Sequence, residues 1–320
     1  MATRLINAKR TDIQKMSASD LKKSIWDSEG RVILSQNYVG MVPLSMGTTN
    51  PELAQAMGAD MVFFNGYSAN EDAEHPGLII SGLTAEGFSR EQYRIPQMRK
   101  LIDVPIGVYL ECGQESDKSN FLSFLVREDR IASPKNLQKL LDEKVDFVVL
   151  GGNPGTGTKY DAILNATKEA KKVLGDNMVI FSGKWEDGSK EPVIGDPMRS
   201  QDFYKELISS LIDAGADVIC MPMPGSRWGI NVDCIRDLVT FVHTYKQGTL
   251  VMTFLDGTVE GSDVDTIRQC SLWSKLTGAD IHSIGDAGLG GMSIPENIYQ
   301  MAITIKGRAK TWERMSASRR

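Results

Sequence analysis

Cysteine and histidine are scarce in this chain, which limits the metal and disulfide chemistry it can contain. The 320 residues include four cysteines and three histidines. The histidines show no metal-ligand spacing, and no Cys-x-x-Cys pair occurs among Cys112, Cys220, Cys234 and Cys270. Such cysteine usage is typical of a reducing compartment, so we expect a cytoplasmic protein.

Long apolar runs and an excess of positive charge are also missing. No run approaches the ~18 apolar residues that a membrane-spanning helix needs, and the N-terminus has no apolar signal core. The net charge of −5 offers no basic surface of the kind that binds nucleic acid. We therefore expect neither a membrane nor a nucleic acid as partner. A Gly-x-Ser-x-Gly turn is absent as well, which excludes the nucleophile elbow of serine hydrolases.

The chain does contain a regular alternation of apolar segments of strand length and amphipathic segments of helix length, which is typical of parallel βα units. The predicted strands are Val32–Ser35, Met61–Asn65, Ile106–Leu110, Phe147–Leu150, Val179–Ser182, Val218–Met221, Val251–Leu255 and Ile281–Ile284. The predicted helices are Pro51–Met57, Arg90–Ile102, Pro134–Glu143, Tyr160–Leu174, Asp202–Ala214, Val232–Tyr245, Val264–Leu276 and Pro295–Ala317.

Eight such units, with strands that are apolar on both faces, predict an α/β fold of the (βα)8 or TIM-barrel type. The barrel would occupy residues 31–320 as one domain. Residues 1–30 would form a short helical N-terminal extension that covers one end of it. An open, doubly wound sheet is the alternative.

A glycine-rich turn follows the last predicted strand, within Ile281 to Glu296. Ser293 and Glu296 have the spacing of a capping box at the start of the last helix. Gly288, Gly290 and Gly291 leave backbone N–H groups accessible to an anion, and the helix dipole adds a positive end. The turn therefore predicts a phosphate seat. The alternative is a tight connection that needs glycine only for its backbone angles.

A TIM barrel carries its function at the C-terminal ends of its strands, and its phosphate sites use the loops after strands 7 and 8. Here these loops contain Gly257, Thr258 and residues 285–291. Other strand ends supply Asn65, Asn153 and Arg227 as candidate substrate-binding residues. The phosphate could belong to a sugar phosphate, a carboxyphosphate or flavin mononucleotide (FMN).

The loop at residues 151–159 contains several glycines but ends in Gly-Thr-Lys. A nucleotide-hydrolysing P-loop needs Gly-Lys followed by serine or threonine, so the sequence argues against that activity. We expect instead a loop that closes on substrate or makes a second anion contact.

Two charged residues at strand ends are candidates for catalysis. Glu111 follows an apolar strand, where burial would raise its pKa towards that of a general base. Lys184 follows strand 5 beside Trp185; with a lowered pKa it could form an imine, and with its charge it could hold an anionic substrate. The alternative for Lys184 is an exposed loop lysine.

Two further carboxylates, Asp256 and Asp286, end strands 7 and 8. Glu111 on strand 3 is too far round the ring to complete a three-ligand cage, so the pair Asp256 and Asp286 is the candidate Mg²⁺ site. Asp286 is also a candidate proton carrier. His282 lies inside a predicted strand and is expected to be a hydrogen-bonded core residue.

Short segments resemble two barrel families. Residues 104–108, 145–149 and 215–219 resemble the family typified by the photosystem I biogenesis protein BtpA. Residues 58–67 are similar to phosphoenolpyruvate mutase-type barrels. The chain departs from the first family at the end of strand 3, where Leu110-Glu111-Cys112 stands in place of an Asn-rich end. The second likeness implies magnesium chemistry, but the aspartate-rich metal motif that this family has after strand 3 is absent.

Together these features predict an enzyme that acts on a small phosphorylated metabolite, as a lyase or isomerase. One alternative is an oxidoreductase with FMN on the same seat, which would make the protein yellow. Another is a metabolite-binding or assembly factor without catalysis, because a barrel fold does not imply activity. The outer helices could pair copies of the chain into a homo-oligomer.

Overall fold

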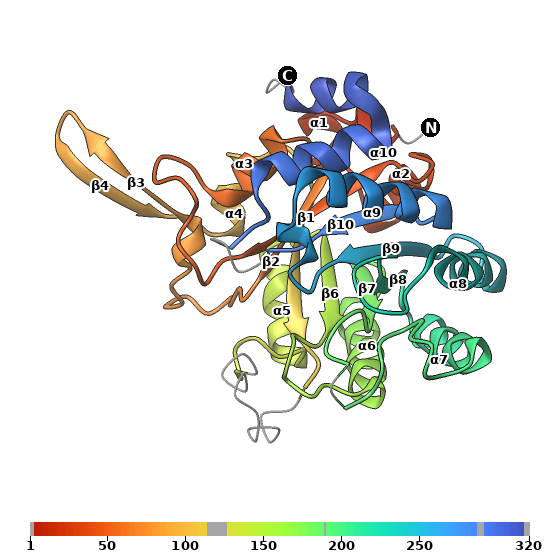
Figure 1. Cartoon of the computed structure of the whole chain (residues 1–320). Coiled ribbons are helices and arrows are strands. Elements are labelled where there is room, and N and C mark those ends of the chain that lie inside the picture. Colours follow the sequence, from red (N-terminus) through yellow and green to blue (C-terminus); the bar gives the residue numbers. More distant parts are fainter. Residues whose placement is uncertain (1–2, 114–126, 189, 287–290, 317–320) are drawn as a thin grey trace.

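A computed structural model describes residues 3–113, 127–188, 190–286 and 291–316. Within these residues, eight parallel strands close a barrel (Figure 1). In chain order they are β1 (Val32–Tyr38), β2 (Met61–Asn65), β5 (Ile106–Glu111), β6 (Phe147–Gly151), β7 (Val179–Gly183), β8 (Val218–Pro222), β9 (Leu250–Leu255) and β10 (Ile281–Ile284). Each strand pairs with its successor in this series, and β10 closes the ring on β1, so the predicted (βα)8 barrel is confirmed.

The barrel strands are apolar on both faces because each face meets a separate core. In β1, Val32 and Leu34 belong to the cluster that fills the barrel interior, whereas Ile33 belongs to the cluster beneath the outer helices. The same alternation places Phe63 of β2 inside and Phe64 outside. Successive side chains of a strand point to opposite faces, so both must be apolar here.

Helices cover the outside of the barrel. They are α3 (Asn50–Ala56), α4 (Ile95–Met98), α5 (Pro134–Asp142), α6 (Tyr160–Leu174), α7 (Gln201–Asp213), α8 (Val232–Tyr245), α9 (Val264–Thr277) and α10 (Pro295–Met315). Ser133 caps α5 by accepting a hydrogen bond from the Asn136 N–H. None of the described helices combines the length and apolar character needed to cross a membrane.

The predicted capping box at the start of α10 is wrong. The residue before the helix is Ile294, which makes no side-chain cap, and Ser293 Oγ donates instead to the Glu260 carbonyl oxygen at 2.8 Å. The hydroxyl therefore joins the loops after β9 and β10, and a tertiary contact has replaced the local one.

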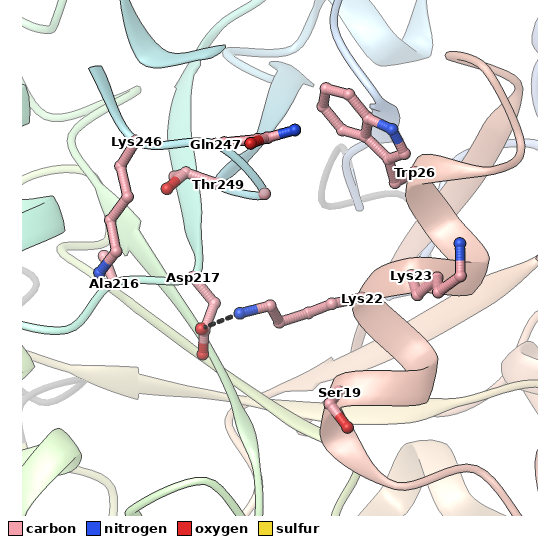
Figure 2. Close-up of a pocket in the computed structure, with 10 residues that line it drawn as sticks. Ser19, Lys22, Lys23, Trp26, Ala216, Asp217, Lys246, Gln247 and Thr249 are labelled. Atoms are coloured by element: carbon pink, nitrogen blue, oxygen red, sulfur yellow. Dashed lines mark hydrogen bonds and ion pairs between the residues drawn. The ribbon is translucent and has the colours of Figure 1, made fainter. Parts of the chain in front are cut away.

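The N-terminal segment packs against the end of the barrel where the strands begin. It forms η1 (Leu5–Asn7), α1 (Arg10–Ile13) and α2 (Ala18–Trp26), and its apolar side chains join the interior cluster. Lys22 Nζ lies 2.6 Å from Asp217 Oδ1, just before β8 (Figure 2). Arg314 of α10 donates to the Leu5 carbonyl at 2.7 Å and to Asp60 at 3.0 Å. This end of the barrel is thus covered, and the opposite end carries the candidate site.

An antiparallel hairpin, β3 (Ile79–Thr84) and β4 (Gly87–Gln92), projects from the barrel (Figure 1). The predicted helix over Arg90–Ile102 is wrong at its start, because residues 90–92 belong to β4 and α4 covers only Ile95–Met98. Leu83 and Phe88 lie opposite each other and are 88% and 66% exposed. A hairpin without a buried face gives no periodic apolar signal, which explains why the sequence did not predict it.

Candidate functional site

Trp185, two residues after β7, lies across the inside of the barrel at the C-terminal ends of the strands. Its ring stacks on Phe254 with 4.0 Å between ring centroids, and it meets Tyr109 edge-on at 6.1 Å. A Cβ atom at Gly151 would lie 2.5 Å from the indole, so glycine leaves the room that this ring needs. Trp185 is 2% exposed, and it separates the apolar interior from the polar residues above it.

Glu111, the last residue of β5, is held by Asn153 and Tyr109, and Asn153 is held in turn by Asn65. Its carboxylate accepts hydrogen bonds from the backbone N–H and the side-chain amide of Asn153, and from the Tyr109 hydroxyl at 3.4 Å. Asn65 Nδ2 donates to Asn153 Oδ1 at 3.0 Å. Three residues predicted separately at strand ends therefore form one group, here named the Glu111 cluster.

Burial raises the pKa of Glu111 to about 7, because the charged form loses its hydration. The hydrogen bonds from Asn153 and Tyr109 act in the opposite direction, since they stabilise the carboxylate. The net result is a carboxyl group poised to gain or lose a proton near neutral pH, which is the property that a general acid or base requires.

Four carboxylates lie together near the ends of β7, β9 and β10, and we name them the acid cluster: Glu186, Asp256, Glu260 and Asp286. Asp256 Oδ1 accepts a hydrogen bond from Gln36 Nε2 at 2.5 Å, and Oδ2 accepts one from Trp185 Nε1 at 2.9 Å. A Cβ atom at Gly285 would overlap Asp256 Oδ1, so glycine is required there.

Burial and repulsion by neighbouring carboxylates raise the pKa values of Asp256 and Glu186. For Asp256 the causes are burial first, then Glu260 and Asp286. For Glu186 they are burial and then Asp256, while Arg227 acts in the opposite direction. Complete ionisation of the four groups is therefore costly without protons or a cation between them.

The acid cluster suits Mg²⁺ in the chemistry of its donors, which are all carboxylate oxygens. In the part of the chain that the structure describes, no group of three or more His, Cys, Asp or Glu residues is arranged to hold a metal ion. The predicted pair Asp256 and Asp286 could thus serve as partial ligands, with water and substrate oxygens completing the shell.

Lys184, directly after β7, is buried and joins two loops. Its ammonium group donates to the carbonyl oxygens of Thr158 at 2.8 Å and Asp187 at 2.7 Å. Burial lowers its pKa, and nearby carboxylates, Asp187 first, oppose this effect. The alternative of an exposed loop lysine is wrong, because Lys184 is 2% exposed.

The glycine-rich loop at residues 151–159 surrounds an internal anion. The Asp187 carboxylate accepts hydrogen bonds from the N–H groups of Gly155 at 3.2 Å and Gly157 at 2.8 Å. Both glycines have positive φ, which turns their amides towards this carboxylate. These two amides, which the sequence offered as a second anion contact, therefore bind a side chain of the protein itself.

The loops after β9 and β10 are adjacent, as the predicted phosphate seat requires. Ser293 Oγ and Asn297 Nδ2 both donate to the Glu260 carbonyl, at 2.8 and 2.9 Å. Gly257 and Thr258 are exposed at their surface. Arg227 Nη2 would lie 3.8 Å from a Cβ atom at Gly257, so this guanidinium lies beside the loop after β9.

Of the three glycines predicted to bind phosphate in the turn after β10, only Gly291 lies in the described part of the chain. Gly291 accepts a hydrogen bond from the Tyr38 N–H at 2.7 Å, and a Cβ atom there would overlap the Tyr38 carbonyl oxygen. Gly291 therefore serves the contact with the end of β1. Gly288 and Gly290 lie outside the described residues.

His282 is a hydrogen-bonded core residue, as predicted. Nδ1 pairs with Ser274 Oγ at 2.6 Å and Nε2 with the Gly30 carbonyl at 3.0 Å. Sequence reasoning missed Glu186 and Glu260 as site residues, because each lies in a loop a few residues beyond a strand end. It also gave Trp185 no role beyond that of a neighbour to Lys184.

Comparison with known proteins yields a family and a fold. The sequence profile of a family described as a domain of unknown function (DUF7916) matches residues 6–320. No curated protein matches the chain. A carboxyl transferase domain of Rhizobium etli pyruvate carboxylase, solved with pyruvate, is 10% identical with a TM-score of 0.52, over 96% of this chain and 51% of that chain. This chain thus spans about half the length of that relative.

Two other similar structures have slightly lower TM-scores. A putative lyase/mutase from Burkholderia cenocepacia is 15% identical with a TM-score of 0.49, covering 88% of this chain and 83% of that one. A phosphonopyruvate hydrolase solved with oxalate and Mg²⁺ is 11% identical with a TM-score of 0.45, covering 84% and 81%. At these identities the likeness concerns the barrel fold alone, and the resemblance to BtpA-type barrels stays a prediction.

Proposed function

The chain belongs to the DUF7916 family, and we propose from its site that it is a barrel enzyme of the lyase or isomerase type. Its substrate would be a small phosphorylated metabolite from which the enzyme removes a proton. The observation that carries this proposal is Glu111, a buried carboxyl group with a pKa of about 7 at the end of a barrel strand.

Glu111 is the proposed general base. Asn153 and Tyr109 fix the orientation of its carboxylate, so the proton-accepting oxygen is held in place before substrate binds. The proton would pass from a substrate carbon to a carboxylate oxygen of Glu111. In an isomerase, Glu111 would return that proton to a neighbouring carbon of the substrate. In a lyase, removal of the proton would accompany cleavage of an adjacent bond in the substrate.

The acid cluster is the proposed electrophilic side of the site. It is connected to the Glu111 cluster through Trp185, which donates to Asp256 and contacts Tyr109. When bound by Asp256 and Asp286, Mg²⁺ would supply the missing positive charge and polarise a substrate oxygen. Asp286, which ends β10 and is partly exposed, is the member of the cluster best placed to exchange protons with solvent.

Electrostatics limit where a phosphate can lie. A phosphate dianion at the loops after β9 and β10 would be repelled by Asp256, Glu260 and Asp286 unless a cation lay between them. Arg227 and Mg²⁺ are the candidate counter charges. We therefore propose that phosphate binds at the Gly257 and Thr258 edge, on the side of Arg227.

Lys184 is the proposed positioning residue of this arrangement. Its two hydrogen bonds to carbonyl oxygens hold the loop after β6 against the loop after β7. Because its ammonium group is engaged in these two bonds, Lys184 is better suited to hold the loops as a charged group than to form an imine with substrate. Borohydride trapping with a carbonyl substrate distinguishes the two roles.

The test is deuterium incorporation from D2O into a panel of phosphorylated carbonyl compounds and 2-oxo acids, followed by NMR with and without Mg²⁺. We expect exchange with at least one compound, and loss of exchange in Glu111→Gln. The matched control is Glu71→Gln, an exposed carboxylate in the loop after β2. Exchange that persists in Glu111→Gln would refute the assignment. A yellow protein would support FMN instead, and binding without any turnover would support the non-catalytic alternative.

A further inference from the structure

Beside the candidate site lies a pocket of about 720 Å³ between the loops after β7 and β8. Its lining includes Lys190, Asp196, Met198, Arg199, Arg227 and Trp228, and we name it the side groove. Ligand pockets commonly have volumes of about 300–1,000 Å³, so the side groove has room for a complete small molecule or for a large part of one.

Arg227 connects the side groove to the candidate site. Its Nε donates to the Trp185 carbonyl at 2.9 Å, and its Nη2 lies 3.9 Å from Glu186 Oε2 in the acid cluster. The same guanidinium lines the side groove. A ligand that contacts Arg227 in the side groove therefore touches a residue that is bonded to the candidate site.

The side groove has a positive character. It is lined by three cations, Lys190, Arg199 and Arg227, and by the carboxylates of Glu191 and Asp196. Those carboxylates are already engaged by backbone amides: Glu191 accepts from the Tyr160 N–H at 2.7 Å, and Asp196 from the Met198 N–H at 2.8 Å. With three cations against two carboxylates the lining has a net charge of +1, and the guanidinium groups of Arg199 and Arg227 have several N–H donors each to offer an anionic ligand.

One wall of the side groove offers an exposed aromatic ring. Trp228 is 72% exposed, next to Met198 at 71%. Gly225 and Gly229, both with positive φ, bound the short turn that presents it, and a Cβ atom at Gly229 would lie 2.7 Å from Pro197. A large indole surface beside guanidinium groups suits a flat aromatic ring that carries an anionic group.

We propose that the side groove binds a ligand with both a heteroaromatic ring and a phosphate group, the chemistry of a nucleoside monophosphate. The ring stacks on Trp228, and the phosphate lies between Arg199 and Arg227. Resting on the proposed function, this makes the substrate a nucleotide-like phosphate ester whose phosphate contacts Arg227, the cation beside Gly257.

The test is isothermal titration calorimetry of the full chain with AMP and UMP. Adenosine and ribose 5-phosphate each present half of the proposed ligand. We expect a nucleotide to bind and each half to bind at least about tenfold more weakly. Trp228→Ala and Arg199→Ala should each weaken nucleotide binding by about tenfold or more. Trp312→Ala, which removes an exposed tryptophan on α10, is the matched control and should change nothing.

The outcomes separate this proposal from the proposed function. Nucleotide binding that Trp228→Ala abolishes and Glu111→Gln preserves supports the side groove, even if no compound exchanges deuterium. If neither AMP nor UMP binds, the proposal is overturned. Equal affinity for ribose 5-phosphate and nucleotide, unaffected by Trp228→Ala, would also overturn it, because the ring would then make no contact.

Discussion

Glu111→Gln should remove a pH-dependent part of the stability. The pKa of Glu111 rises from its usual 4.5 to about 7 on folding, because the carboxyl group is buried above the barrel interior. Between these pH values the folded chain holds a proton that the unfolded chain has released. Stability from this group is therefore complete below pH 4.5 and is lost as pH rises towards 7.

The magnitude follows from linkage. Each pH unit in this interval lowers the free energy of unfolding by about 1.4 kcal/mol, so the total loss is about 3 kcal/mol. Glutamine at position 111 keeps an acceptor oxygen for one of the two Asn153 N–H groups but does not titrate. Relative to Glu111→Gln, the native chain should therefore become less stable by about 3 kcal/mol between pH 4.5 and pH 7.

The assay is urea unfolding at half-unit steps of pH, followed by circular dichroism. Burial also raises the pKa values of Asp256 and Glu186, but these groups are common to both proteins and cancel in the difference between them. Glu71→Gln, which changes an exposed carboxylate, should show a flat difference from the native chain. If Glu111→Gln also shows a flat difference, Glu111 has the same pKa in the folded and unfolded states, and the prediction is wrong.

Three further predictions concern the surrounding residues. Gly285→Ala should displace Asp256, because the added methyl group overlaps a carboxylate oxygen of that residue. We expect the free energy of unfolding, measured by urea unfolding, to fall by about 1–3 kcal/mol. An unchanged unfolding midpoint would contradict this. Lys184→Met should cost about 2–4 kcal/mol in the same assay, since two carbonyls lose a charged donor, whereas the exposed Lys168→Met should be neutral. Mg²⁺ should raise the melting temperature of the native chain and not that of Asp256→Asn, and an equal rise in both would place the ion elsewhere.

The barrel could be predicted because its strands need apolar residues on both faces and its helices need one apolar side. The hairpin at Ile79–Gln92 could not, since most of its residues face solvent and follow no apolar pattern. Ser293 shows the limit of local motifs: its spacing from Glu296 fits a capping box, but its hydroxyl binds a carbonyl in another loop.

The candidate site was predictable where it depends on strand ends alone. Asn65, Glu111 and Asn153 meet because parallel strands of one barrel end at the same rim. Glu186 and Glu260 depend on the paths of loops, which periodicity does not specify. The sequence also could not show that Asp187 binds the amides of Gly155 and Gly157, because that contact joins two separate loops.

The general-base role proposed for Glu111 depends on one property: this buried carboxyl group at the barrel rim changes charge near neutral pH. It is tested most directly by ¹³C NMR titration of glutamate labelled at the side-chain carboxyl carbon, with the Glu111 signal assigned by its absence in Glu111→Gln. We expect a titration midpoint at about pH 7 for this signal. A midpoint close to the usual 4.5 would contradict it.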